Sequence, residues 1–242
     1  DTAYTMATAK YDAFADGLGD YNNIMGAVNP LFFGGDGVVF NERANDSISY
    51  ETPSFMGLTG SLTYGQQNEA GLTGNDPEMW SLAAVYANGP LSVIAAYEIN
   101  KDTTTNGDAE AWKIGAGYQF GNTRIAGFYE RIQFDSATSD YERDAWYVSV
   151  VHQMGNIALK AAYAMADEGE LNGVNTNDGA QQWTLGVDYS LSKRTTAYAL
   201  YTSLDNDNNA GFNLGVSSSN GIAPTAGSQN PNGLSIGLKH SF

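Results

Sequence analysis

Apolar and polar residues alternate along most of this chain, and this alternation constrains the fold more than any other feature of the sequence. The last ten residues show it clearly, because Leu234, Ile236, Leu238 and Phe242 fall on one face. Successive side chains of a β-strand point to opposite faces, so a period of two predicts a strand over residues 233–242. Taken alone, this segment would also fit the edge strand of a soluble β-protein.

The same pattern recurs from Asp46 onward, where eleven segments are predicted as strands. Turns rich in Asn, Gly and Pro separate them. The alternation leaves the facing of 123–134 and 194–203 unassigned. The predicted strands cover about 46–51, 58–66, 79–87, 91–99, 110–120, 123–134, 144–153, 157–166, 181–190, 194–203 and 233–242.

The predicted connections alternate between short turns and long loops, as in outer-membrane barrels, whereas a soluble sandwich has no reason to sort its loops by length. Aromatic residues gather near the predicted strand ends, where the girdles of a membrane barrel lie. These aromatic residues are Tyr64, Trp80, Tyr86, Tyr97, Trp112, Tyr118, Trp146, Tyr163, Trp183 and Tyr189.

The opposite face of the predicted strands carries charges that a dry core would not tolerate unpaired, so a water-filled lumen is expected. These residues are Glu51, Glu98, Lys113, Lys160, Asp188 and Lys239. The fold class predicted from these patterns is all-β, an antiparallel transmembrane β-barrel.

Composition excludes several other classes. The net charge of -16, with 27 acidic and 11 basic residues, argues against a nucleic-acid partner. No run of about 18 apolar residues is present, so no membrane-spanning helix is expected. The mean hydropathy of -0.32 is typical of a soluble protein, but barrel strands are only half apolar and escape that test. Without cysteine, the chain forms no disulfide and no thiolate metal site.

Three segments resemble the general-porin family of Gram-negative bacteria, the trimeric, sixteen-stranded type. Residues 45–58, NDSISYETPSFMGL, look like the strand and turn that follow the family's constriction loop. Residues 30–36, PLFFGGD, look like the tip of that loop, and residues 237–242, GLKHSF, look like the final strand. The order and spacing of these segments carry the resemblance, which covers nearly all of the chain.

The resemblance implies one porin domain over residues 1–242, with 1–45 as the constriction loop and 46–242 as barrel strands. In the family, that loop follows the fifth strand and eleven strands come after it. The chain is therefore expected to be the C-terminal part of a larger barrel. Two alternatives stay open: a complete twelve-stranded barrel, with one strand drawn from residues 1–45, and a disordered N-terminal tail.

The function implied is a water-filled outer-membrane channel for passive diffusion of small hydrophilic solutes and ions. The expected partners are membrane lipid, lipopolysaccharide and two further copies in a homotrimer, and neither a cofactor nor an enzymatic activity is implied. Phe242 is expected to act as a signal for barrel assembly. The acidic side of the constriction is predicted at Asp12, Asp16, Asp20, Asp36 and Glu42, and a basic wall at Lys113, Arg124, Arg131, Lys160 and Lys239.

Because residues 1–45 carry more acids than bases, a weak preference for cations is predicted, mainly through Asp16, Asp20 and Asp36. An outer-membrane barrel enzyme of the lipase or protease type, or an adhesin-like β-protein, remains the alternative function. The two histidines, His152 and His240, are interpreted as structural or interfacial residues. Residues 205–211 resemble a calcium loop faintly but lack its downstream Glu, so no metal site is predicted.

Overall fold

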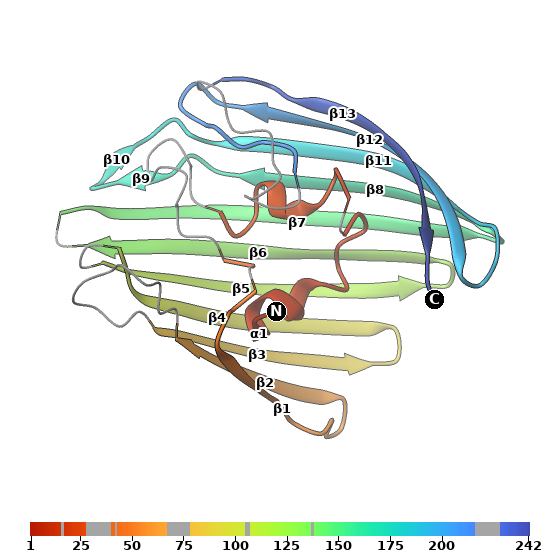
Figure 1. The fold of residues 1–242 in the computed structure, drawn as a ribbon, viewed down its shortest axis with the longest axis horizontal. Helices are drawn as coiled ribbons and strands as arrows, with labels where there is room; N and C mark the ends of the chain where they lie inside the picture. The colour runs from red at the N-terminus through yellow and green to blue at the C-terminus, as the bar shows by residue number, and fades with distance from the viewer. Residues whose placement is uncertain are drawn as a thin grey trace.

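Eleven long antiparallel strands form a single curved sheet in the computed structural model, and each strand pairs with the next long strand along the chain (Figure 1). The structure describes residues 1–15, 17–27, 40–41, 43–66, 78–104, 107–136, 138–215 and 228–242. The long strands are β1 (Ser47–Glu51), β2 (Leu58–Gln66), β3 (Glu78–Asn88), β4 (Leu91–Thr104), β5 (Gly107–Phe120), β6 (Thr123–Ser136), β7 (Asp140–Met154), β8 (Ile157–Ala166), β11 (Ala180–Ser190), β12 (Thr195–Asn206) and β13 (Asn232–His240).

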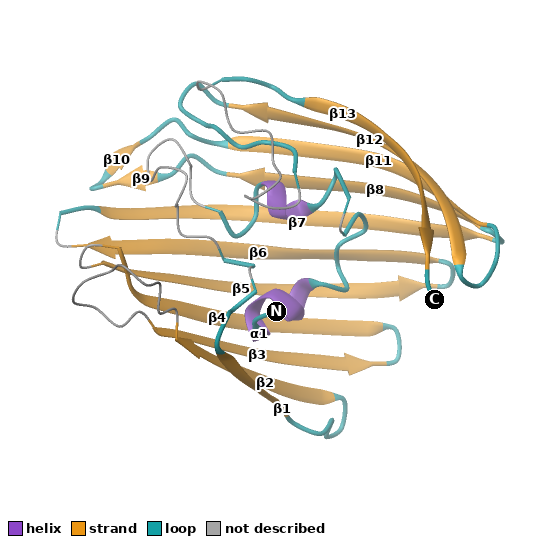
Figure 2. Cartoon of the chain, viewed as in Figure 1, coloured by secondary structure: helices purple, strands orange, loops and turns teal. Residues whose placement is uncertain are grey.

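Four smaller elements complete the described structure. Strands β9 (Glu170–Leu171) and β10 (Val174–Asn175) form a small hairpin that extends the sheet next to β7. Helix α1 (Ala3–Thr8) and the 3₁₀-helix η1 (Tyr21–Asn23) lie on one face of the sheet (Figure 2). In the described part of the chain, no helix has the length and apolar character needed to cross a membrane.

The eleven predicted strands are confirmed, but the loops predicted near residues 100–109 and 135–143 are too long. Strand β4 reaches Thr104 and β5 begins at Gly107, with an irregularity in their pairing between Asn100 and Thr104, while β6 reaches Ser136 and β7 begins at Asp140. Polar residues occupy both faces there, so the alternation in hydrophobicity disappears although the backbone ladder continues. The part of residues 1–45 that the structure describes contains no strand, so the twelve-stranded alternative gains no support there.

The sheet has two chemically different faces. The face that we call inward packs against α1 and η1, and it buries residues such as Ala111, Phe128 and Ile132. The outward face exposes large apolar side chains along its whole width, among them Ile114 at 52% and Leu185 at 55% exposure. An exposed apolar face of this extent is expected to lie against lipid.

The strand register gives the tilt of the strands. When the backbone pairing is followed across β4, Trp80 on β3 lies opposite Glu110 on β5, which is two residues before Trp112. The same shift of two residues leads from Trp112 to Trp146 and from Trp146 to Trp183. Two residues rise by about 6.6 Å along a strand, and two strands span about 9.6 Å across the sheet. If the tryptophans lie at one height in the membrane, the strands are therefore tilted by about 35° from the membrane normal. Transmembrane barrels have strand tilts of this size.

The four tryptophans provide a test of the outward face. Each is between 37% and 49% exposed on the side opposite to the helices. We expect quenchers dissolved in the lipid phase to reduce the fluorescence of the folded protein in bilayers, while water-soluble quenchers have little effect. Quenching by the water-soluble agents alone would show that this face does not contact lipid.

Candidate pore constriction

Residues 1–15 and 17–27, here called the docked segment, cross the inward face of the sheet, and Figure 1 shows the N-terminus over the middle strands. Helix α1 contacts β2, β3 and β4. Aromatic side chains anchor the segment further along, because the Tyr21 ring lies 5.2 Å from the rings of both Phe128 and Tyr147 on the wall. The segment therefore narrows the space on the inward side of the sheet.

The first turn of α1 is held by hydroxyl groups of its own chain and of the wall. Thr2 caps the helix, because its hydroxyl accepts from the amide of Thr5 at 3.1 Å. The amides of Ala3 and Tyr4, which lack partners within the helix, donate to Thr63 Oγ1 at 3.2 Å and Ser81 Oγ at 2.8 Å. The helix start is thus fixed to β2 and β3.

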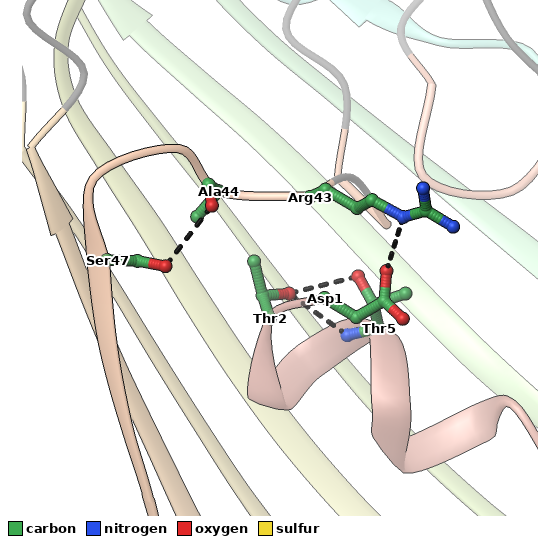
Figure 3. Close-up of polar contacts among 6 residues, drawn as sticks. All are labelled: Asp1, Thr2, Thr5, Arg43, Ala44 and Ser47. Carbon is green, nitrogen blue, oxygen red and sulfur yellow. Dashed lines mark hydrogen bonds and ion pairs between the residues drawn. The ribbon is translucent and has the colours of Figure 1, made fainter.

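An ion pair closes this region on the side away from the wall. Arg43 Nε donates to Asp1 Oδ1 at 3.2 Å, which links the start of the chain to residues just before β1 (Figure 3). The Arg43 side chain is 84% exposed. Such an exposed pair contributes little to stability, and the guanidinium stays available to solutes.

A buried polar network fixes the middle of the docked segment. Lys113 on β5 and Glu130 on β6 are direct cross-strand neighbours on the inward face and are almost fully buried. Glu130 accepts from the Tyr4 hydroxyl at 2.7 Å and from the amide of Gly26 at 2.6 Å. Lys113 Nζ donates to Thr8 Oγ1 at 2.8 Å and lies 3.7 Å from the centre of the Tyr4 ring. Both charges of the wall are therefore used to bind the segment.

Gly26 is suited to this network in two ways. Its φ of +75° is a conformation that side chains with a Cβ rarely adopt. A Cβ at this position would also collide with the carbonyl of Phe40. Glycine therefore allows the chain to turn sharply and aim its amide at Glu130.

A pair of acidic residues lies between α1 and η1. Asp12 Oδ1 accepts from the amide of Phe14 at 2.8 Å and from the hydroxyl of Tyr147 at 3.2 Å. Asp20 is buried, and its carboxylate caps η1 by accepting from the amide of Asn22 at 2.9 Å. Burial raises the pKa of the Asp12 carboxyl to about 7, and the nearby Asp20 carboxylate adds to the rise.

The predicted acidic side of the constriction is therefore only partly placed. Asp12 is half-buried and hydrogen-bonded to Tyr147, and Asp20 is 3% exposed, so neither carboxylate stands free in open water. Asp16, Asp36 and Glu42 lie outside the described residues, as does the predicted loop tip at 30–36.

Four of the five residues of the predicted basic wall point inward. Lys113 is buried under α1, and Lys160 pairs with Asp188 at 3.0 Å. Arg124 donates to the carbonyl of Lys10, and Lys239 Nζ donates to the carbonyl of Ala15 at 3.3 Å. Three of these side chains bind the docked segment and Lys160 pairs with an acid of the wall, so they form a docking wall more than an open charged surface.

The prediction for Arg131 is wrong, because this residue lies on the outward face. It is opposite Trp112 in the register and forms a two-point ion pair with Asp144, with N–O distances of 2.6 and 2.8 Å. The sequence left the facing of this strand unassigned, since apolar residues occur on both of its faces. On the inward face they pack under the docked segment, where Phe128 and Ile132 are buried.

Several inward residues were not predicted as part of the site. Glu130 binds the docked segment, and Arg143 on β7 donates to the carbonyl of Ile24 at 3.0 Å. Gln182 on β11 donates to the carbonyl of Gly19 at 3.1 Å and accepts from Asn23 at 2.9 Å. The alternation in the sequence could have placed Arg143 and Gln182 on the inward face, because it assigned the faces of β7 and β11. It could not have placed Glu130, because the facing of β6 was left unassigned.

Two remaining predictions concern the chain end and metals. The Phe242 ring is fully exposed and lies 5.0 Å from the His240 ring. Its role in assembly stays a prediction. Among the described residues, no group of three or more His, Asp or Glu side chains is arranged to hold a metal ion.

Comparisons with known proteins agree on one family. The Gram-negative porin family model matches residues 1–209. The chain is 28% identical to outer membrane porin protein 32 of Delftia acidovorans, over 96% of this chain and 66% of that protein. It is 24% identical to the major outer membrane protein P.IB of Neisseria meningitidis serogroup B, over 74% of this chain and 59% of that protein. The matched regions thus span less than two thirds of these relatives.

Solved structures share the fold. The anion-selective porin from Comamonas acidovorans superimposes with a TM-score of 0.80 at 24% identity, covering 100% of this chain and 72% of that one. OmpT of Vibrio cholerae gives a TM-score of 0.69 at 20% identity, covering 99% and 73%. With the family model matching most of the sequence, the chain belongs to the Gram-negative porin family and is an outer-membrane protein.

Proposed function

We propose that the whole protein forms a water-filled channel for passive diffusion of small hydrophilic solutes and ions across the outer membrane. The observation that carries this proposal is the contrast between the two faces of the sheet. The outward face is apolar, whereas the inward face holds a segment of the chain through buried polar groups. A docked segment of this kind restricts a lumen by size and charge.

Residues 1–45 act as the constriction in this proposal, and three copies of the protein assemble as the resemblance implies. Single-channel recording of the full-length protein in a planar bilayer tests both points. Discrete conductance steps are expected, and they should close in groups of three if the protein is a trimer. A barrel enzyme or an adhesin would give no regular conductance steps.

The charge preference of the channel depends on which groups meet the solute. The predicted weak cation preference finds no support, because the similar porin from Comamonas acidovorans is anion-selective, Asp20 is buried and Asp12 is half-buried and bound by Tyr147. Lys10 and Arg43 are exposed on the open side of the same region. We therefore favour a weak preference for anions, set in this region by Lys10 and Arg43.

Reversal potentials in a salt gradient test this assignment. The double variant Lys10→Gln, Arg43→Gln should shift the reversal potential of the full-length channel toward cations, because two exposed positive charges are lost near the permeation path. Asp20→Asn is the matched control and should change it little, since that carboxylate is buried. A large shift for Asp20→Asn with none for the double variant would restore the acidic assignment.

A further inference from the structure

A polar acceptor stands two residues before each tryptophan. The four triplets are Glu78-Met79-Trp80, Glu110-Ala111-Trp112, Asp144-Ala145-Trp146 and Gln181-Gln182-Trp183. Residues two apart on a strand share a face, so these acceptors point outward with the tryptophans. We call Glu78, Glu110, Asp144 and Gln181 the acceptor row.

The acceptor row runs parallel to the row of tryptophans, because each acceptor is two residues before its tryptophan on the same strand. If the tryptophans lie at one height in the membrane, so do the acceptors. The acceptor row lies on the side of the tryptophans that faces the longer connections. From the tryptophans to the short turns, the outward positions of β3 to β8, β11 and β12 carry no Lys, Arg, Asp or Glu. Charge on the outward face thus begins sharply at this row.

A donor from a neighbouring strand binds each member of the row. Lys101 Nζ donates to Glu78 at 3.1 Å. The hydroxyl of Tyr97 donates to Glu110 at 2.6 Å, and that of Tyr163 donates to Gln181 at 2.8 Å. Because their acceptors are satisfied within the sheet, these groups can lie at the edge of a hydrocarbon layer.

Asp144 has more donors than any other member of the row, and one of them is Arg131 on β6. Asp144 accepts from the Nε and Nη2 atoms of Arg131 and also from the hydroxyl of Tyr129 at 2.7 Å. The Tyr129 ring lies between two tryptophans, 5.1 Å from the Trp112 ring and 4.5 Å from the Trp146 ring. The guanidinium is therefore fixed in orientation, which lowers the entropy lost when it binds a further group.

The Nη1 atom of Arg131 has no hydrogen-bond partner among the described residues, and the side chain is 35% exposed. We propose that Arg131 docks the phosphate of a membrane-lipid headgroup at the level of the acceptor row. A guanidinium fork matches a phosphate, and the tryptophan row places this arginine where headgroups meet the hydrocarbon. Asp144 orients the fork in this proposal and does not contact the lipid.

This inference rests on the membrane placement of the sheet and not on conduction. The test uses full-length protein in detergent, titrated with phosphatidylglycerol and followed by native mass spectrometry, with an uncharged diacylglycerol glycoside as the comparison lipid. Arg131→Gln should weaken phosphatidylglycerol binding about ten-fold, as expected for loss of a charge-assisted hydrogen bond. Binding of the glycoside should not change.

Two further variants separate lipid docking from loss of the ion pair. Arg131→Gln, Asp144→Asn leaves no unpaired carboxylate and should still bind phosphatidylglycerol about ten-fold more weakly. Arg124→Gln removes the same charge from the inward face of the same strand and should bind normally. Unchanged binding by the double variant, an equal loss for the glycoside, or an equal loss in Arg124→Gln would overturn the proposal. Heat-modifiable gel migration confirms that each variant is folded, and conductance measured separately reports on the channel.

Discussion

Replacing Glu130 with glutamine should raise the rate of amide hydrogen exchange in α1 by about 100-fold. The variant leaves Lys113 buried beside Tyr4 without its cross-strand counter-charge. Breaking one partner of a buried pair costs about 3–5 kcal/mol, and each 1.4 kcal/mol changes an opening equilibrium about ten-fold. Because the segment opens locally while the sheet stays folded, exchange reports the loss directly.

The measurement is hydrogen–deuterium exchange with mass spectrometry on the full-length protein, read on peptides covering residues 1–15. Glu51→Gln is the control, because Glu51 faces inward on the exposed strand β1 and removal of its charge should leave exchange in α1 unchanged. Lys113→Met should raise exchange as Glu130→Gln does.

The double variant Lys113→Met, Glu130→Gln separates pairing from simple contact. With both charges gone, neither partner of this pair stays buried without the other, so the double variant should open less readily than the sum of the single effects predicts. Strict additivity would show that the two residues act independently and that their position as cross-strand neighbours has no energetic role.

The strands could be predicted from the sequence because a membrane barrel forces one face to be apolar. The bounds of β2 and β8 agree with the prediction, and most others are longer than predicted because the ladder continues where both faces are polar. Helix α1 has six residues, too few for a helical period to stand out. Its position is set by hydrogen bonds to Ser81 and Thr63, which no local pattern announces.

The candidate site was harder to predict than the fold, because charge alone does not say which way a side chain points. Asp20 was predicted to face the channel, yet its carboxylate caps a short helix. Asp and Asn often bind nearby backbone amides in this way, so such residues in a loop are ambiguous. Arg131 was predicted to face inward but lies at the outer edge of the apolar band, where an arginine can reach polar headgroups.

Raising the pH from 5 to 8 should loosen the docked segment around Asp12. In the docked state the pKa of this carboxyl is about 7, because of burial and then of Asp20, against about 3.9 for an exposed Asp. Docking is therefore coupled to binding of a proton by Asp12. The free energy of docking is most favourable below about pH 4, becomes less favourable as the pH rises towards about 7, and changes little at higher pH.

Hydrogen exchange of residues 11–15, corrected for the intrinsic effect of pH on exchange, measures this loosening. The opening equilibrium constant should rise about ten- to 100-fold, because each pH unit between the two pKa values contributes at most about ten-fold. Asp12→Asn should abolish the dependence and keep the segment closed at pH 8, because an amide needs no proton to stay buried. Asp46→Asn makes the same chemical change in the turn before β1 and should leave the wild-type profile intact. A profile that persists in Asp12→Asn would assign the titration to another group, and a flat wild-type profile would show that Asp12 stays ionised while docked.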